Sequence, residues 1–102
     1  MRAHDYQALA ARTLLDGSDR SVSGRDLMMV WNAIGLTGEA GECAELVKKG
    51  VLHGHGLDTD KLSKELGDVL WYVAALATTA GLSLGGIMAS NIDKLRTRYP
   101  DG

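Results

Sequence analysis

The segment Gly38-Glu-Ala-Gly-Glu-Cys-Ala-Glu45 carries two patterns at helical spacing that differ in polarity. One stripe begins upstream as an apolar series and then reaches carboxylates; its members are Leu27, Val30, Trp31, Ile34, Gly38, Glu42 and Glu45. A separate face is apolar and consists of Leu36, Ala40, Cys43, Ala44 and Val47. The pattern predicts a helix with carboxylates where its core stripe should continue, so these groups would be partly buried and would need partners.

A second acidic pair lies in the segment Lys64-Glu-Leu-Gly-Asp-Val-Leu-Trp-Tyr72. Each pair, Glu39 with Glu42 and Glu65 with Asp68, has the spacing i, i+3, which puts both carboxylates on one side of a helix. If the two pairs face each other, they offer four oxygen ligands, the kind that Mg²⁺ or Mn²⁺ requires.

Two readings of these acidic pairs compete. A lone pair of this kind usually belongs to a solvated helix face. Here the pairs adjoin apolar stripes, and helix-weakening glycines accompany them at positions 38, 41 and 67, which indicates close approach of a ligand or another helix. From the residues alone, one shared metal site and two solvated faces both stay open.

The remaining periodicity predicts a single all-α domain over residues 1–102, with four or five helices. A first helix is expected to end near Asp16-Gly17, and a second to start after the N-cap candidate Ser23. A third is expected from about Asp60 to Ala80, preceded by the capping candidates Asp58 and Thr59. Gly81 then stops that helix, and Ser83 caps the last one.

The third predicted helix is apolar nearly all round from Val69 onward, which is typical of a helix buried on several sides. In a domain of 102 residues, a second subunit is the simplest cover for Trp71. We therefore expect the bundle to be completed by dimerisation.

The last predicted helix carries a polar and basic edge formed by Asn91, Lys94 and Arg98. The two cations could be ordinary surface groups favoured near a helix C-terminus. Alternatively, they face the acidic pairs and hold a polyphosphate, Arg98 through its planar fork and Lys94 as a point charge. Tyr72, one turn beyond Asp68, is a further candidate for hydrogen bonds to a sugar or phosphate.

Composition excludes several classes of function. The net charge is −2 with acids and bases interspersed, so no basic stripe for a nucleic-acid backbone is present. No apolar run is long enough for a membrane span, and the first residues lack the pattern of a secretory signal, so a cytoplasmic location is expected. We read Cys43 as a core residue, and the pair His53 and His55 as part of a glycine-rich loop, although such a pair can bind a transition metal.

Three segments together resemble the MazG-like nucleoside triphosphate pyrophosphohydrolases, an all-α superfamily. They are Gly38 to Glu45 with its ExxE motif, Lys64 to Tyr72 with its ExxD motif, and Asn91 to Pro100 with the terminal Arg98-Tyr-Pro. The opening Asp5-Tyr6-Gln7 and the His-Gly-His loop are also similar to such proteins. The match covers most of the chain from Trp31 to Pro100, with the motifs in family order.

The resemblance implies Mg²⁺-dependent hydrolysis of a nucleoside triphosphate between its α- and β-phosphates, giving a monophosphate and pyrophosphate, with Mn²⁺ as a substitute metal. It implies Glu39, Glu42, Glu65 and Asp68 as metal ligands, with Glu45 supporting them or serving as an alternative ligand. It also implies a homodimer or a tetramer built from dimers, with sites near subunit contacts. Relatives directed at dCTP usually carry a tryptophan shortly after the first acidic motif, where this chain has Val47-Lys48-Lys49, so the base preference stays open.

Physical reasoning adds roles to these residues. We expect Glu42 to be the general base, because its place on the core stripe favours a raised pKa. Lys94 and Arg98 are expected to hold the β- and γ-phosphates, and Asn91 and Tyr72 to bind the sugar or phosphates. Two alternatives remain: a phosphoribosyl-ATP pyrophosphohydrolase of the same fold, and a non-catalytic helical module that binds nucleotide or protein.

Overall fold

The computed structural model describes residues 1–14 and 21–102. Its helices are α1 (Ala3–Ala11), α2 (Gly24–Leu52), α3 (Thr59–Thr79) and α4 (Leu84–Arg98), and no strand occurs in the described ranges. The prediction of an all-α fold with four or five helices is confirmed. The predicted end of the first helix near Asp16-Gly17 lies outside the described residues, and α1 already ends at Ala11.

Local signals that the sequence predicted set the bounds of the helices. The hydroxyl oxygen of Ser23 accepts a hydrogen bond from the Asp26 amide at 3.0 Å and starts α2, and the carboxylate of Asp58 accepts one from the Lys61 amide at 3.0 Å and starts α3. The hydroxyl oxygen of Ser83 accepts one from the Gly86 amide at 3.1 Å at the start of α4. These polar side chains satisfy backbone donors that a helix leaves free at its first turn.

Gly81 ends α3 in the left-handed region, with φ of +74°. The amide of Gly81 donates to the Thr78 carbonyl at 3.1 Å, and the amide of Leu82 donates to the Ala77 carbonyl at 2.8 Å. This pair of bonds is the Schellman arrangement, in which a residue without Cβ adopts positive φ at little cost. The predicted stop at Gly81 is thereby confirmed.

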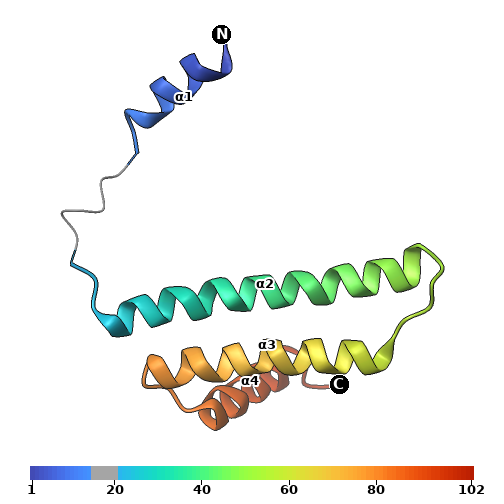
Figure 1. Ribbon diagram of the computed structural model, residues 1–102. Helices are drawn as coiled ribbons and strands as arrows, with labels where there is room; N and C mark the ends of the chain where they lie inside the picture. Colours follow the sequence, from blue (N-terminus) through green and yellow to red (C-terminus); the bar gives the residue numbers. More distant parts are fainter. Residues whose placement is uncertain (15–20) are drawn as a thin grey trace.

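An antiparallel hairpin of α2 and α3 is the centre of the structure (Figure 1). Gly35 lies against the ring of Tyr72, and Gly50 lies against the backbone of Gly56 and Leu57, so the two contacts fix the register of the helices. The residues of α2 that are buried or half-buried lie along one side of the helix and recur every three or four positions, as in a helix seam. They are Met29, Asn32, Gly35 with Leu36, Glu39, Cys43, Leu46 and Gly50.

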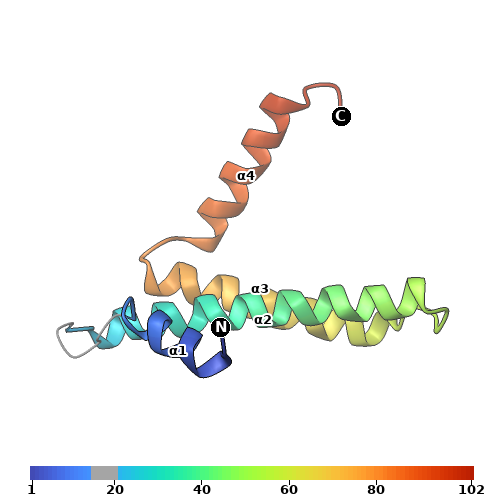
Figure 2. The ribbon, with the colours of Figure 1, turned by 90° about the horizontal axis from the view of Figure 1, so that it is seen from above.

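Helix α4 leaves the hairpin instead of lying along it. It contacts α3 but not α2, and Figure 2 shows it running away from the hairpin axis. The axes of α3 and α4 are bent by 108° at the short break between them. Taken singly, no described helix has both the length and the apolar content to cross a bilayer, although the bent pair passes that test jointly.

The described chain buries few of its apolar side chains. Ala77 is its buried apolar residue, whereas Trp31 and Trp71 are 59% and 62% exposed. The radius of gyration is 20.0 Å, compared with about 13 Å for a compact chain of about 100 residues. Helix α1 contacts no other described helix, and its Tyr6 is 67% exposed. These apolar faces remain open in a single copy.

Candidate active site

Carboxylates from both helices of the hairpin meet at one level of the seam. Glu39, Glu42 and Glu65 each offer an oxygen within 4.8 Å of the others. Their convergence follows from the i, i+3 spacing on α2 and from the antiparallel register, which sets Glu65 opposite the first acidic pair. Asp68 lines a surface hollow together with Glu39, but it does not belong to this group of three.

Two of these carboxylates are short of partners. Glu39 and Glu65 are half-buried, and one oxygen of each, Oε2, is buried without a hydrogen-bond partner among the described residues. A buried carboxylate oxygen without a donor is costly, so such oxygens are normally satisfied by a hydrogen bond or a cation. The donor set consists entirely of carboxylate oxygens, which suits a hard divalent cation such as Mg²⁺ or Mn²⁺.

The electrostatics of the cluster reflect the closeness of its carboxylates. The pKa of Glu39 is raised from 4.5 to about 7, mainly by burial and in addition by the neighbouring carboxylates of Glu42, Glu65 and Asp68. The sequence led us to expect a partly buried carboxylate with a raised pKa at Glu42; the structure shows a raised pKa at Glu39, which the register turns into the seam, while the side chain of Glu42 is exposed.

Cys43 follows Glu42 on α2 and is half-buried at the seam. Burial raises the pKa of its thiol, and the negative charges of Glu65 and Glu39 add to the effect. A thiol with a raised pKa stays protonated and is a poor nucleophile near neutral pH. The structure is consistent with the interpretation of Cys43 as a packing residue.

The structure brings some other predicted residues to the cluster. Tyr72 lines a hollow of about 350 Å³ together with Glu39, Asp68 and Trp71. Glu45 shares a neighbouring hollow with Glu42 and Glu65, and it forms exposed ion pairs with Lys48 at 3.6 Å and Lys49 at 3.7 Å. Glu45 therefore borders the group of three without belonging to it.

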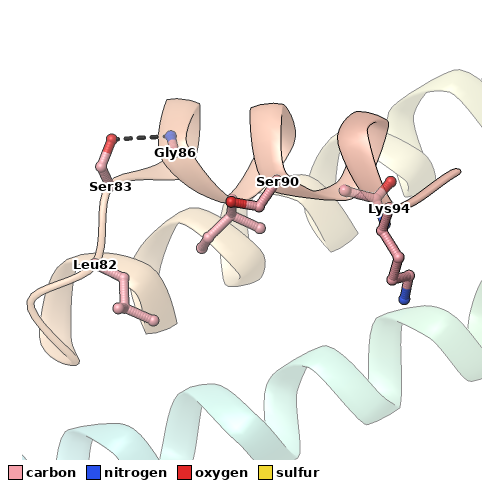
Figure 3. A pocket seen from close by; sticks show the side chains of 7 residues that line it. Leu82, Ser83, Gly86, Ser90 and Lys94 are labelled. Carbon is pink, nitrogen blue, oxygen red and sulfur yellow. Dashed lines mark hydrogen bonds between the residues drawn. The ribbon is translucent and has the colours of Figure 1, made fainter. Parts of the chain in front are cut away.

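The basic edge of α4 lies elsewhere in a single copy. Asn91 and Lys94 line a separate pocket of about 520 Å³ beside the α3–α4 turn, with Leu82 and Ser83 among its other residues (Figure 3). Arg98 is the last residue of α4. This pocket is distinct from the hollows that Glu39, Glu42 and Glu65 line.

Residues that the sequence reasoning missed also surround the cluster. Lys49 and Lys61 line the hollow that holds Glu42 and Glu65, and Trp71 lines the one that holds Glu39. Their positions follow the acidic faces at helical spacing: Lys61 is one turn before Glu65, and Trp71 is one turn after Asp68. That spacing could have identified them once the two helices were set antiparallel.

Comparisons with known proteins identify the family of the chain. The family model described as the MazG nucleotide pyrophosphohydrolase domain matches residues 32–102, a range that contains all four predicted carboxylates. The chain belongs to the MazG family. This MazG chain is also 37% identical over 109 residues to the "Gene 37 protein" of Mycobacterium phage L5, covering 100% of this chain and 92% of the phage protein. No solved structure gives a significant match.

Family membership indicates nucleotide pyrophosphohydrolase activity for the MazG chain, and the resemblance that the sequence predicted is confirmed. It also gives the acidic cluster a chemical context, because the matched range includes both helices of the hairpin.

Proposed function

We propose that this protein hydrolyses nucleoside triphosphates, including deoxy or non-canonical ones, to a monophosphate and pyrophosphate by attack of water at the α-phosphate. The observation that supports this most directly is the meeting of Glu39, Glu42 and Glu65 within 4.8 Å, two of them with buried, unpartnered oxygens. Like charges at such separations are unfavourable unless a proton or a metal cation lies between them. The proposed cation is Mg²⁺, with Mn²⁺ as a substitute.

Glu39, Glu42, Glu65 and Asp68 would hold this cation. When bound, it would polarise the α-phosphoryl group and offset the negative charge of the leaving pyrophosphate. The half-buried pair Glu39 and Glu65 would serve mainly as ligands, because one oxygen of each is buried and has no hydrogen-bond partner among the described residues. Asp68 and Glu45 border the cluster, where they can complete or support the ligand set.

Glu42 is our candidate for the general base. It is the exposed member of the group of three, so water reaches it while its oxygen stays near the other two carboxylates. A carboxylate in that place can take the proton from the attacking water. Access to water is thus the reason for the choice of Glu42.

The protein would act as a homodimer or as a tetramer built from dimers. Both tryptophans are more than half exposed, and the radius of gyration is 20.0 Å, so a single copy leaves much apolar surface open. In such an assembly, α4 of one copy could cover the cluster of another. Asn91, Lys94 and Arg98 would then contribute to substrate binding across the subunit contact.

Pyrophosphate release from a panel of substrates tests the proposal. The panel holds the standard ribo- and deoxyribonucleoside triphosphates, several damaged ones and phosphoribosyl-ATP, each with Mg²⁺. In ¹⁸O-labelled water, we expect pyrophosphate as a product and the label in the monophosphate. Glu42→Gln should nearly abolish turnover with the fold intact, while Asp60→Asn, an exposed acid outside the site, should leave it unchanged.

Three other outcomes of this assay would change the assignment. Hydrolysis confined to phosphoribosyl-ATP would assign the alternative substrate, and label in the pyrophosphate would place attack at the β-phosphate. No Mg²⁺-dependent pyrophosphate release from any substrate would favour a non-catalytic binding module and would refute the proposed function.

A further inference from the structure

Arg25 links the two helices of the hairpin at the end away from their connection. It lies in the first turn of α2, and its Nε donates a hydrogen bond of 2.8 Å to the carbonyl of Thr79, the last residue of α3. Within residues 1–14 and 21–102, no other side-chain hydrogen bond joins two helices. Arg25 is therefore the polar side-chain link between α2 and α3 in the described chain.

The bond from Arg25 completes the hydrogen bonding at the end of α3. A helix leaves its last four carbonyls without partners inside the helix. Three of those carbonyls accept bonds from amides of the turn that follows; the pairs are Leu76 with Ala80, Ala77 with Leu82, and Thr78 with Gly81. The fourth carbonyl, that of Thr79, accepts its bond from Arg25. Loss of the arginine would thus remove the protein donor for the last carbonyl of α3.

The charge of Arg25 suits α3 better than its own helix. A cation in the first turn of a helix opposes the dipole of that helix, whereas a cation at a helix C-terminus is favourable. Arg25 is in the first position with respect to α2 and in the second with respect to α3. The Ser23 hydroxyl caps α2 through the Asp26 amide at 3.0 Å, and this bond orders the turn that carries Arg25. The contact with α3 accounts for a cation at this position.

The end of α3 also sets where α4 begins. Only residues 80–83 separate the two helices, and their axes are bent by 108° across this turn. The pocket beside the turn is lined from Leu82 to Lys94, so the turn and the basic edge of α4 share one face (Figure 3). Arg98 lies about 21 Å along α4 from its first residue, at 1.5 Å per residue, so a tilt of about 10° at the turn would displace it by about 4 Å.

We propose that Arg25 is a positioning residue for substrate binding. By holding the Thr79 carbonyl it fixes the end of α3, and thereby the direction in which α4 carries its basic edge. This inference rests on the proposed function, in which that edge binds substrate across the subunit contact. Arg25 precedes residues 32–102, so the role concerns a part of the chain that the family model does not match.

Two variants of Arg25 separate its hydrogen bond from its charge and bulk. Arg25→Met removes the donor and keeps a long side chain, whereas Arg25→Gln removes the charge and keeps an N–H donor as many bonds from Cα as the arginine Nε. In Arg25→Met, KM for the best triphosphate should rise roughly two- to tenfold with kcat unchanged, the range for loss of one hydrogen bond. Arg25→Gln should stay within about twofold of the wild type. Lys64→Gln, which removes an exposed cation from the other half of α3, should leave KM unchanged.

Two further measurements distinguish positioning from a general loss of stability. Glu39 lies about 21 Å from Arg25 along α2, so Mn²⁺ should bind to the carboxylates equally well in Arg25→Met and the wild type. Amide hydrogen exchange at Gly81 and Leu82 should be roughly two- to tenfold faster in Arg25→Met than in the wild type or Arg25→Gln. Exchange at Ala40, near the middle of α2, should be the same in all three proteins.

Several results would overturn the positioning role. They are an unchanged KM in Arg25→Met, Mn²⁺ binding weakened as much as KM is raised, failure of Arg25→Gln to restore KM, and unchanged exchange at Gly81 and Leu82. Turnover by the wild type with the same KM in Arg25→Met would refute the positioning role and keep the proposed function. Absence of wild-type turnover with faster exchange in Arg25→Met would refute the proposed function and keep the hold of Arg25 on the α3–α4 turn.

Discussion

Substitution of Gly35 by alanine probes the contact that holds Tyr72 beside the acidic cluster. A Cβ at residue 35 would overlap the Tyr72 ring, with Cδ1 at 2.9 Å and other ring atoms closer still. Overpacking of this kind costs about 1–3 kcal/mol, whereas alanine in place of glycine within a helix gains about 1 kcal/mol. Gly35→Ala is therefore expected to lower the free energy of unfolding by about 0–2 kcal/mol.

Gly41→Ala is the matched control for this measurement. Gly41 lies in the same helix, and a Cβ there would meet nothing within 4 Å beyond the helix's own backbone. The control should gain the full helix propensity, so the two variants should differ by about 1–3 kcal/mol in urea unfolding at equal protein concentration. If Gly35→Ala proved as stabilising as Gly41→Ala, Tyr72 would not rest on Gly35, and the position of Tyr72 beside the acidic cluster would be wrong.

Two further predictions concern charge and capping. The pKa of Glu39 is raised from 4.5 to about 7 in the folded, metal-free protein. At pH values between these two, the folded state therefore binds more protons than the unfolded state. Its free energy of unfolding should thus increase as the pH falls from about 8 to about 5; thermal unfolding across that range checks this, and an unchanged slope in Glu39→Gln would contradict it. Asp58→Ala should cost about 1 kcal/mol by removing the α3 N-cap, whereas Ser63→Ala, an exposed control, should cost little; equal unfolding midpoints for the two would show that the cap contributes nothing.

The sequence predicted the helices well because their signals are local. Ser23, Asp58 and Ser83 cap helices through bonds to amides three residues away, and Gly81 ends α3 through its own φ. The acidic pairs were predictable for a related reason. A short connection between two long helices makes them antiparallel neighbours, so carboxylates on the two facing stripes meet.

What the sequence could not predict depends on angles and register between helices. Periodicity placed Asn91, Lys94 and Arg98 on one edge of α4, but the direction of α4 is set by the 108° bend at the α3–α4 turn, and Asn91 and Lys94 line a pocket beside that turn. Burial of Glu39 in preference to Glu42 depends on which of them faces α3.

The predicted close approach to Gly38, Gly41 and Gly67 is not made within the described part of one chain. A Cβ at any of the three would meet nothing within 4 Å beyond the helix's own backbone. Approach by a ligand or by a helix of another copy stays a prediction.

Binding of Mn²⁺ tests the central claim, that these carboxylates form a metal centre, most directly. Titration calorimetry near pH 8 compares the wild-type chain with Glu65→Gln and with the exposed control Asp60→Asn. We expect Glu65→Gln to weaken Mn²⁺ binding by at least about tenfold, in line with the loss of one charged ligand, and Asp60→Asn to bind as the wild type does. Equal affinity of the wild type and Glu65→Gln for Mn²⁺ would contradict the account.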